Sequence, residues 1–530
     1  MSEVLSKSSY VIGIDLGTST SIASIFTKGK SRLIKIEGND YIPSVVSFLD
    51  KDTKLVGVEA KGRMMIDPAN TVASIKRHMG EDGYKVKIND IEYTPEEISA
   101  EILRKIVQAA KEQENFETLG EITNAVICIP ANFTDNAKQA TLKAAEMANL
   151  NVLYLLEEPV AAAIMYGFNI TRSQKILVYD LGGGTFDVCI LDANTNESGN
   201  ANYDILAKEG INQLGGDDFD QKLMGIINDK FLKENNIDIL DTTKDQGISK
   251  KKIKQATQKL KEAAEKAKIE LSENDTTNVL IPNIIQDEKG ELLSVDVEIT
   301  KEEFNTAIDQ LINKTEEAVS RALENSKLTV EDIDKIILVG GSTLVPRIKE
   351  KVKDIFGIEP YSNFNPRTIV SEGAAIFGAT LSVPSDCVKN DEVKPEGDIN
   401  ISQIVTHNLG IMISGMRFSK LIEKSTEIPK GKVISEEKEY STQSDNQTEL
   451  NLLIYQCDED VEFINEKNMD GDDKAVCIGE FKLTNIPSKP KGEEKIIVKF
   501  EVNEENIVNV IATCISNGSE NNVTLDVKRL

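Results

Sequence analysis

The sequence predicts a two-lobed α/β domain followed by an all-β domain. Three observations lead to this prediction. The chain has 530 residues, which is too many for one compact core, so two or three domains are expected. A glycine-rich strand–turn–strand motif occurs twice, one lobe apart. From Ile404 to Leu530 the hydrophobic pattern shifts toward the alternation that is typical of β-strands.

The first glycine-rich motif lies between Val11 and Phe26. The apolar run 11–14 predicts one strand, and the polar–apolar alternation of 21–26 predicts the next. Small side chains and backbone N–H groups in such a turn bind phosphate, and a neighbouring carboxylate holds a hydrated cation. The turn carries the candidate nucleotide-binding residues Asp15, Gly17, Thr18, Ser19 and Thr20.

The second motif, Lys175–Leu191, repeats this plan of strand, glycine turn and strand. Two such hairpins predict a duplicated architecture that closes on one nucleotide. Asp180 and Asp187 are expected to hold Mg²⁺ through water, together with Asp15, because Mg²⁺ keeps most of its hydration shell. The turn itself carries Gly182, Gly183, Gly184 and Thr185.

A third glycine site follows the apolar strand 335–339. Its turn contains Gly340, Gly341 and Ser342, and Pro346 then opens a helix, where the fixed φ of proline is tolerated. Strand, glycine pair and helix in this order let backbone approach a ligand closely. Each glycine site alone is typical of an ordinary tight turn. Three of them in this order favour a phosphate site.

Composition argues against several classes of function. The net charge of −27, from 61 basic and 88 acidic residues, argues against binding to nucleic acid or to anionic membranes. No apolar run approaches the roughly 20 residues that span a bilayer, and residues 1–10 lack a hydrophobic signal core. The six cysteines lack C-x-x-C spacing, so reduced thiols and a cytoplasmic location are expected. The chain has only two histidines, which argues against His-based catalysis.

Six motifs stand out along the chain. They are Ile14-Asp-Leu-Gly-Thr18, Glu158-Pro-Val-Ala-Ala-Ala163, Tyr179-Asp-Leu-Gly-Gly-Gly-Thr-Phe-Asp187, Leu214-Gly-Gly-Asp-Asp-Phe-Asp220, the segment 260–272 and Leu338-Val-Gly-Gly-Ser-Thr343. Together they resemble the 70-kDa heat-shock protein chaperones, which belong to the actin and sugar-kinase ATPase superfamily, and the match covers nearly the whole chain. The resemblance implies an actin-like α/β ATPase domain in residues 1–384, a linker in 385–403 and a peptide-binding β-sandwich in 404–530.

The resemblance also implies roles in ATP hydrolysis. Lys76 corresponds to a lysine that reaches the γ-phosphate and the attacking water, although a lone lysine is usually solvated. Glu158 corresponds to the residue that positions this water, although a carboxylate before a helix is most often a cap. Glu157 beside it is then incidental. Thr185 is expected to touch the γ-phosphate. Such catalysis rests on positioning and charge stabilisation, and its expected residues are Lys76, Glu158, Asp180, Thr185 and Asp187.

The nucleoside side of the expected site both follows the family and departs from it. ATP or ADP with Mg²⁺ is the expected ligand. Leu344 stands where the family usually has an arginine that packs on the purine, which leaves Arg367 as the candidate replacement. Without such a cation, the free energy of nucleotide binding is expected to weaken by about 1 kcal/mol or more. The resemblance assigns further nucleotide contacts to Gly215, Gly216, Asp217, Glu265, Lys268 and Ser272.

The C-terminal part departs from the family in its linker and its end. The linker segment 399–403 keeps two apolar residues and lacks the usual aspartate. Ile411, Leu450 and Leu452 fall where the peptide pocket is expected, or they form plain sandwich core. The chain stops at the last expected strand, without the helical lid. A truncated chain or a lidless relative of the ribosome-associated regulatory type is expected.

Two functions from different classes remain open at this point. The first is an ATP-dependent chaperone that binds unfolded or nascent polypeptide and hydrolyses ATP slowly, with a J-domain co-chaperone and a nucleotide exchange factor. The second is a weakly catalytic or non-catalytic regulatory partner of the ribosome-associated type that binds ATP and acts through a J-domain protein. A small-molecule kinase or filament protein on the same fold is a third, which the sandwich-like C-terminal part disfavours. Direct nucleic-acid or membrane binding is not expected.

Overall fold

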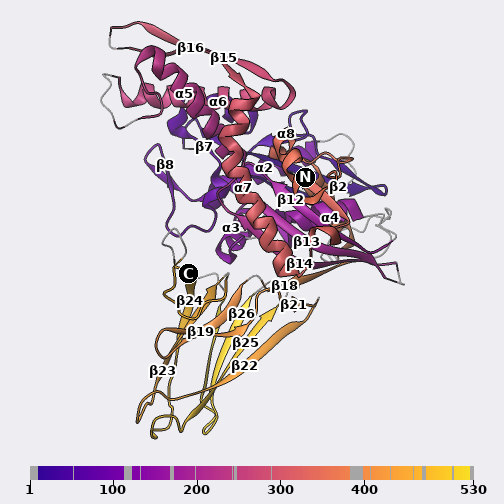
Figure 1. The fold of residues 1–530 in the computed structure, drawn as a ribbon, viewed down its shortest axis with the longest axis vertical. Helices are drawn as coiled ribbons and strands as arrows, with labels where there is room; N and C mark the ends of the chain where they lie inside the picture. The colour runs from indigo at the N-terminus through magenta and orange to yellow at the C-terminus, as the bar shows by residue number, and fades with distance from the viewer. Residues whose placement is uncertain are drawn as a thin grey trace, which may run out of the picture.

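The structure is a computed structural model. It describes residues 10–525 except 52, 113–121, 132, 168–171, 197–198, 242, 244–247, 288, 382–397, 406, 430, 458, 468–472 and 504–506. Residues 385–397 of the predicted linker therefore lie outside the described residues. Figure 1 shows the α/β part of the molecule above a β-sandwich, with the long helix α7 (Lys301–Ser326) running down toward the sandwich.

Among the described residues, two mixed sheets share one plan and form the centres of two lobes. The first has the order β11-β10-β1-β2-β3, with β4 paired to β2. Its strands are β1 (Val11–Leu16), β2 (Thr20–Thr27), β3 (Lys30–Leu33), β4 (Ile42–Pro43), β10 (Asn124–Ile129) and β11 (Asn151–Glu157). In it, β1 runs antiparallel to β2 and parallel to β10.

The second sheet repeats this arrangement, in the order β17-β12-β13-β14-β18-β21. Here β12 runs antiparallel to β13 and parallel to β17. The two glycine motifs thus form equivalent hairpins, which confirms the predicted duplication. The strands are β12 (Gln174–Leu181), β13 (Phe186–Thr195), β14 (Ala201–Ile211), β17 (Lys335–Val339), β18 (Ile399–Ile404) and β21 (Glu427–Ile428).

Two small-residue helices pack between the lobes. They are α4 (Glu158–Gly167) and α9 (Ile369–Thr380), and together with residues of both sheets they form one buried cluster. A Cβ on Gly373 of α9 would lie 1.8 Å from the carbonyl oxygen of Ala161 on α4. The absence of a side chain there lets the helices cross in direct backbone contact. This crossing fixes the angle between the two phosphate hairpins.

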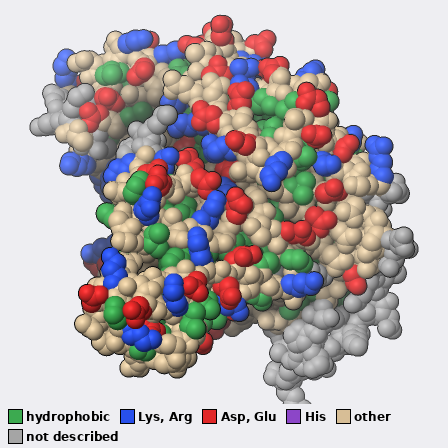
Figure 2. Space-filling model, turned by 60° about the horizontal axis from the view of Figure 1, so that its bottom comes forward, with side chains coloured by type: hydrophobic (Ala, Val, Ile, Leu, Met, Phe, Trp, Pro, Cys, Tyr) green, Lys and Arg blue, Asp and Glu red, His purple; other side chains and the backbone are tan. Residues whose placement is uncertain are grey.

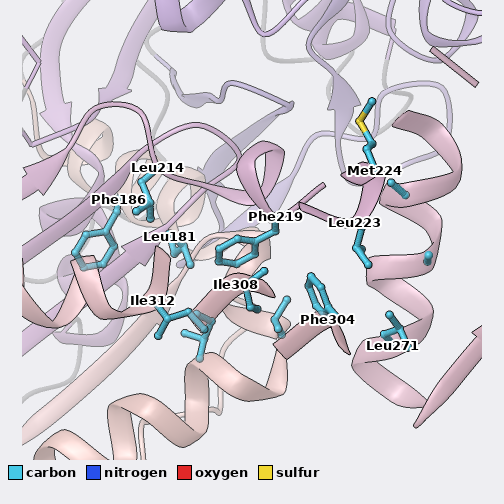
Figure 3. Packing of buried hydrophobic residues seen from close by; sticks show 14 of the residues in the cluster. Leu181, Phe186, Leu214, Phe219, Leu223, Met224, Leu271, Phe304, Ile308 and Ile312 are labelled. Atoms are coloured by element: carbon cyan, nitrogen blue, oxygen red, sulfur yellow. The ribbon is translucent and has the colours of Figure 1, made fainter. Parts of the chain in front are cut away.

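The outer part of the second lobe is built from helices around a hairpin. The strands are β15 (Thr276–Gln286) and β16 (Leu292–Thr300), and the helices are α5 (Gly216–Asn235), α6 (Lys250–Glu273) and α7. Helix α8 (Pro346–Phe356) packs on α7. Figure 3 shows Phe219 of α5 and Phe304 of α7 in the core there, with Leu223, Ile308 and Ile312 around them. The two rings meet edge to face, with centroids 6.5 Å apart.

The outer part of the first lobe is smaller. A sheet of β5 (Val45–Phe48), β6 (Lys54–Val56) and β7 (Thr71–Ala73) lies beside α1 (Val58–Arg63) and the 3₁₀ turn Pro68–Asn70. The hairpin β8 (Val86–Ile88) and β9 (Ile91–Tyr93) leads to α2 (Pro95–Glu112), which packs on α3 (Asp135–Met147). The short 3₁₀ helix η2 (Ile75–His78) connects β7 to this region.

The C-terminal part consists of strands, as the alternation of the sequence predicted, and they form the sandwich that the resemblance implied. One sheet has the order β20-β19-β23-β24 and the other β22-β25-β26-β27. Their inward residues, such as Leu452, Val498 and Phe500, form a separate core. The strands are β19 (Asn408–Ile413), β20 (Arg417–Ile422), β22 (Val433–Ser441), β23 (Leu450–Cys457), β24 (Ala475–Leu483), β25 (Lys495–Asn503), β26 (Val508–Cys514) and β27 (Glu520–Leu525).

The end of the predicted linker forms β18, which extends the second sheet by pairing parallel to β14. Its apolar side chains Ile399 and Ile401 are buried. Its polar side chains pair with β14: Asn400 donates to Asn202 at 3.0 Å, and Ser402 donates to Asp204 at 2.7 Å. Polar contacts therefore hold this strand where the sequence lacks the family's apolar run.

A buried lysine connects the linker strand to the first lobe. The Nζ of Lys208 on β14 lies 2.6 Å from Oε1 of Glu157 and donates to Oε1 of Gln403 at 2.7 Å. The Lys208 side chain is only 1% exposed. The expectation that Glu157 is incidental is therefore wrong, because Glu157 binds Lys208, which in turn binds Gln403 of the linker strand. Sequence neighbourhood alone could not pair residues this far apart.

Candidate active site

The two phosphate hairpins face each other across a cleft of about 980 Å³. Nearly all the predicted nucleotide-binding residues line it, from both lobes. From the first lobe these are Asp15, Gly17, Thr18, Ser19, Thr20, Lys76 and Glu158. From the second they are Asp180, Gly182, Gly183, Thr185, Gly216, Asp217, Glu265, Lys268, Ser272, Gly340, Gly341, Ser342 and Arg367.

Three predicted residues lie beside the cleft without lining it. Gly215 and Gly184 allow close approach of neighbouring segments: a Cβ on Gly215 would lie 2.5 Å from the Gly183 carbonyl. A Cβ on Gly184 would lie 2.7 Å from the Arg77 guanidinium. Asp187 is buried on β13 in direct register with Asp180. These two glycines therefore shape the turns at the cleft wall. The charge of Asp187 helps to raise the pKa of Asp180, which lines the cleft.

The innermost part of the cleft holds an ion pair between Lys76 and Glu158. Lys76 comes from η2 and Glu158 from the first turn of α4, directly after β11. Nζ and Oε1 are 2.6 Å apart, and each residue is 8% exposed. A surface role for Lys76 is therefore wrong. A buried cation and carboxylate, side by side at the meeting point of two phosphate turns, suit phosphoryl transfer to water.

Negative charge is crowded around this pair. Burial and then the Glu158 carboxylate raise the pKa of Asp15 to about 7, although Lys76 opposes the rise. Burial and neighbouring Glu158 and Asp187 raise the pKa of Asp180 well above its ordinary value. Burial alone would lower the pKa of Lys76, but Glu158 and Asp15 outweigh it and raise this pKa. The site therefore has more negative charge than its lysine can balance.

The outer half of the cleft is crossed by contacts that the sequence did not indicate. The carboxylate of Glu265 pairs with Nζ of Lys61 at 2.8 Å, which joins the two lobes at the mouth. Ser74 donates to Asp217 at 2.9 Å, again between lobes. These partners were missed because nothing in the local sequence relates residues on opposite lobes.

The predicted nucleoside-side residues of α6 make contacts within the second lobe. Nζ of Lys268 lies 2.8 Å from Asp220 and donates to the Gly216 carbonyl at 3.0 Å. The hydroxyl of Ser272 donates to the carbonyl of Lys268 within its helix. Both residues line the cleft while making these bonds, so they form a fixed wall.

The predicted departure on the purine side is present in the structure. Leu344 lines the cleft and is 47% exposed. The Arg367 guanidinium lies 5.8 Å from the ring centroid of Tyr41, which comes from the other lobe. Arg367 thus already stacks on an aromatic ring at the cleft wall.

The Lys61–Glu265 bridge gives a first prediction. Lys61→Ala should speed nucleotide dissociation by up to about fivefold, because an exposed ion pair contributes about 0.2–1 kcal/mol. Stopped-flow displacement of a fluorescent ADP analogue measures this rate. Lys222→Ala, at an exposed position of α5 away from the cleft, is the matched control. An unchanged dissociation rate in Lys61→Ala would show that the bridge does not hold the cleft closed.

Comparison with known proteins agrees with this architecture. Residues 11–529 match the Hsp70 protein family. The chain belongs to the Hsp70 family. It is 39% identical over 536 residues to the chaperone protein DnaK of Thermotoga neapolitana, an alignment that covers 99% of this chain and 83% of the relative. This Hsp70 is accordingly an ATPase and an ATP-dependent chaperone, which is the first of the two expected functions.

The fold of the family accounts for the arrangement described above, in which a two-lobed actin-like ATPase precedes a β-sandwich. In the described part of this Hsp70, every helix is too short or too polar to cross a membrane. On the face drawn in Figure 2, basic and acidic side chains are interspersed, and no broad basic patch forms there.

Proposed function

We propose that ATP hydrolysis occurs at the Lys76–Glu158 pair, with the γ-phosphate held between Thr18, Lys76 and Thr185. The observation that carries this proposal is the buried pair itself, 2.6 Å apart at the meeting point of the two hairpins. The Lys76 ammonium stabilises charge that develops on the phosphoryl oxygens. Glu158 accepts a hydrogen bond from the attacking water and orients it.

The acidic cluster suits a hydrated Mg²⁺ ion. Among the described residues, no three His, Cys, Asp or Glu side chains come together as direct ligands of one metal ion. Asp180 and Asp187 are nevertheless buried and Asp15 is half-buried around the phosphate turns, and their excess charge suits a cation. These three carboxylates would therefore hold Mg²⁺ through its water molecules, as Mg²⁺ prefers. When bound, the ion would neutralise charge on the phosphate oxygens.

Arg367 is proposed to cover the purine in place of the missing family arginine. Arg367→Ala should weaken ATP binding by about fivefold or more, because a desolvated cation over an aromatic face contributes roughly 1 kcal/mol or more. Titration calorimetry measures the affinity. Arg347→Ala removes an arginine of α8 that pairs with Asp309 outside the cleft, and serves as the control. Equal ATP affinity in the Arg367 variant and the wild type would remove Arg367 from the site.

We further propose the domain boundaries 1–384, 385–403 and 404–530, with β18 as the coupling element between cleft and sandwich. Gln403 of β18 binds Lys208, and Lys208 binds Glu157. These contacts support the role because Glu157 ends β11 and the next residue, Glu158, lies in the cleft. In the sandwich, Ile411 and Leu452 are each 3% exposed within the core, and Leu450 is partly buried. A pocket for extended polypeptide at these residues would share their side chains with the core.

A J-domain co-chaperone, a nucleotide exchange factor and a cytoplasmic location complete the proposal. The test is single-turnover hydrolysis of radiolabelled ATP by the full chain, with and without a J-domain protein. Turnover that rises with the J-domain protein, together with ATP-dependent peptide release, is the expected result. Tight ATP binding without turnover would instead favour a regulatory protein that acts through its J-domain partner.

A further inference from the structure

The cleft adjoins a second cavity at its phosphate end. This inner cavity has a volume of about 270 Å³ and shares Thr18, Lys76 and Thr185 with the cleft. These are the residues assigned above to the γ-phosphate, so the following inference rests on the proposed function. The wall that holds the γ-phosphate is thus also a wall of a separate cavity behind it.

The inner cavity in turn adjoins the space between the ATPase part and the β-sandwich. This interdomain cavity, of about 750 Å³, shares Phe133, Thr134 and Asn212 with the inner cavity. Phe133 also places its ring 5.5 Å from the Lys76 ammonium. The cleft, the inner cavity and the interdomain cavity therefore follow one another from the phosphate end toward the sandwich.

The mouth of the cleft offers phosphate no free way out while ADP is bound. Phosphate formed by hydrolysis lies at Lys76 and Thr185, at the inner end. Bound ADP would fill the cleft between this position and the mouth, where the Lys61–Glu265 pair bridges the lobes. A product that leaves before ADP needs another path.

Arg77 gives the inner cavity an anion-binding wall. One of its terminal nitrogens donates to Asp218 at 2.9 Å and to the Gly183 carbonyl at 3.4 Å. Its Nε is buried and has no acceptor among the described residues. Arg77 lines the inner cavity but not the cleft. An anion in this cavity would meet the fixed positive charge of the Arg77 guanidinium.

We propose that inorganic phosphate leaves through the inner cavity, past Arg77, into the interdomain cavity while ADP remains in the cleft. No bond forms or breaks in this step. The exit opens beside Lys208, Glu209 and Lys424. Glu209 binds Lys424 of the sandwich at 2.7 Å, and so the docked sandwich forms one side of the exit.

The test follows [³²P]phosphate as it enters and leaves the full-length chain saturated with ADP. Asn212→Trp places a large ring on an exposed turn between β14 and α5, where the inner and interdomain cavities meet. It should slow phosphate association and dissociation equally, by about tenfold, because an obstructed path raises a barrier without changing either end state. The equilibrium affinity for phosphate and acid-quenched single-turnover hydrolysis should stay unchanged. Gln221→Trp, an equally exposed position outside all three cavities, is the matched control.

A second variant tests the charge. Arg77→Gln should slow phosphate release by about three- to tenfold, because it removes a charge-assisted hydrogen-bond donor from the path. Arg77→Lys should restore part of the rate, which a purely structural role would not explain. Thermal unfolding of both variants reports whether the contact with Asp218 is needed for folding.

The alternative route through the mouth is tested by Lys61→Ala. This variant should speed ADP dissociation and leave phosphate release unchanged. Faster phosphate release in Lys61→Ala, with no effect of Asn212→Trp, would overturn the inner route. Normal ATP hydrolysis, with a rate of phosphate release that neither Asn212→Trp nor Lys61→Ala changes, would also overturn the inner route. This outcome would leave the proposed catalytic site intact. A wild-type chain without hydrolysis would overturn the proposed function.

Discussion

Lys76→Ala is expected to reduce single-turnover ATP hydrolysis by about 100- to 1,000-fold, which is the usual effect of removing a donor that stabilises transition-state charge. The ammonium is the cation bonded to Glu158, and its pKa is raised by the surrounding carboxylates, so it is charged in the working protein. Acid-quenched turnover of radiolabelled ATP measures the effect.

Binding and stability must be separated from the chemical step in this variant. Removing the lysine leaves Glu158, Asp15 and Asp180 without their nearest cation, so some loss of stability accompanies the loss of rate. ATP affinity is therefore measured on the same preparation, with thermal unfolding. Lys222→Ala on the exposed face of α5 is the control. A Lys76→Ala protein that binds ATP and hydrolyses it at the wild-type rate would contradict the assignment of the catalytic lysine.

Lys208→Met is expected to give the largest loss of stability, about 3–5 kcal/mol in the free energy of unfolding, because it leaves a buried carboxylate unpaired. Glu157 is 8% exposed, and its Oε2 already has no partner among the described residues. Denaturant unfolding measures the loss. Amide hydrogen exchange in residues 399–404 should become faster, because Gln403 loses the hydrogen bond from Lys208 that holds β18 in place.

A double variant separates the two effects of Lys208. Glu157→Gln combined with Lys208→Met removes the unpaired charge, and should recover a large part of the stability. Hydrogen exchange in β18 should stay high, since the contact from Lys208 to Gln403 is still missing. Protection of β18 equal to that of the wild type in both variants would show that the hydrogen bonds of Asn400 and Ser402 hold the linker without Lys208.

The sequence predicted the repeated hairpins and their glycine turns because these features are local, whereas the sandwich and cleft residues such as Lys76 and Glu158 came from the resemblance to the family. A glycine turn between an apolar strand and an alternating strand needs no distant partner to be recognised. Every predicted residue of the first turn lines the cleft.

The contacts between lobes could not be predicted in this way. Arg77 and Asp218, Lys61 and Glu265, and Lys208 with Glu157 each join residues that no local pattern relates. The linker is the clearest case. Its sequence lacks the family's aspartate and contains polar residues, and from this we could predict only a departure from the family. The structure shows what the polar residues do: Asn400 pairs with Asn202, and Ser402 pairs with Asp204.

The sequence by itself therefore determined which chemical groups this Hsp70 carries and on which turns they lie. Only the tertiary structure decided which charges face each other, because the crossing of α4 and α9 sets the two hairpins against one another. Lys76 lines both the cleft and the inner cavity, which no local pattern in the sequence could show. Short-range patterns record the period of a helix or strand, whereas the partner of a buried charge depends on how whole lobes pack.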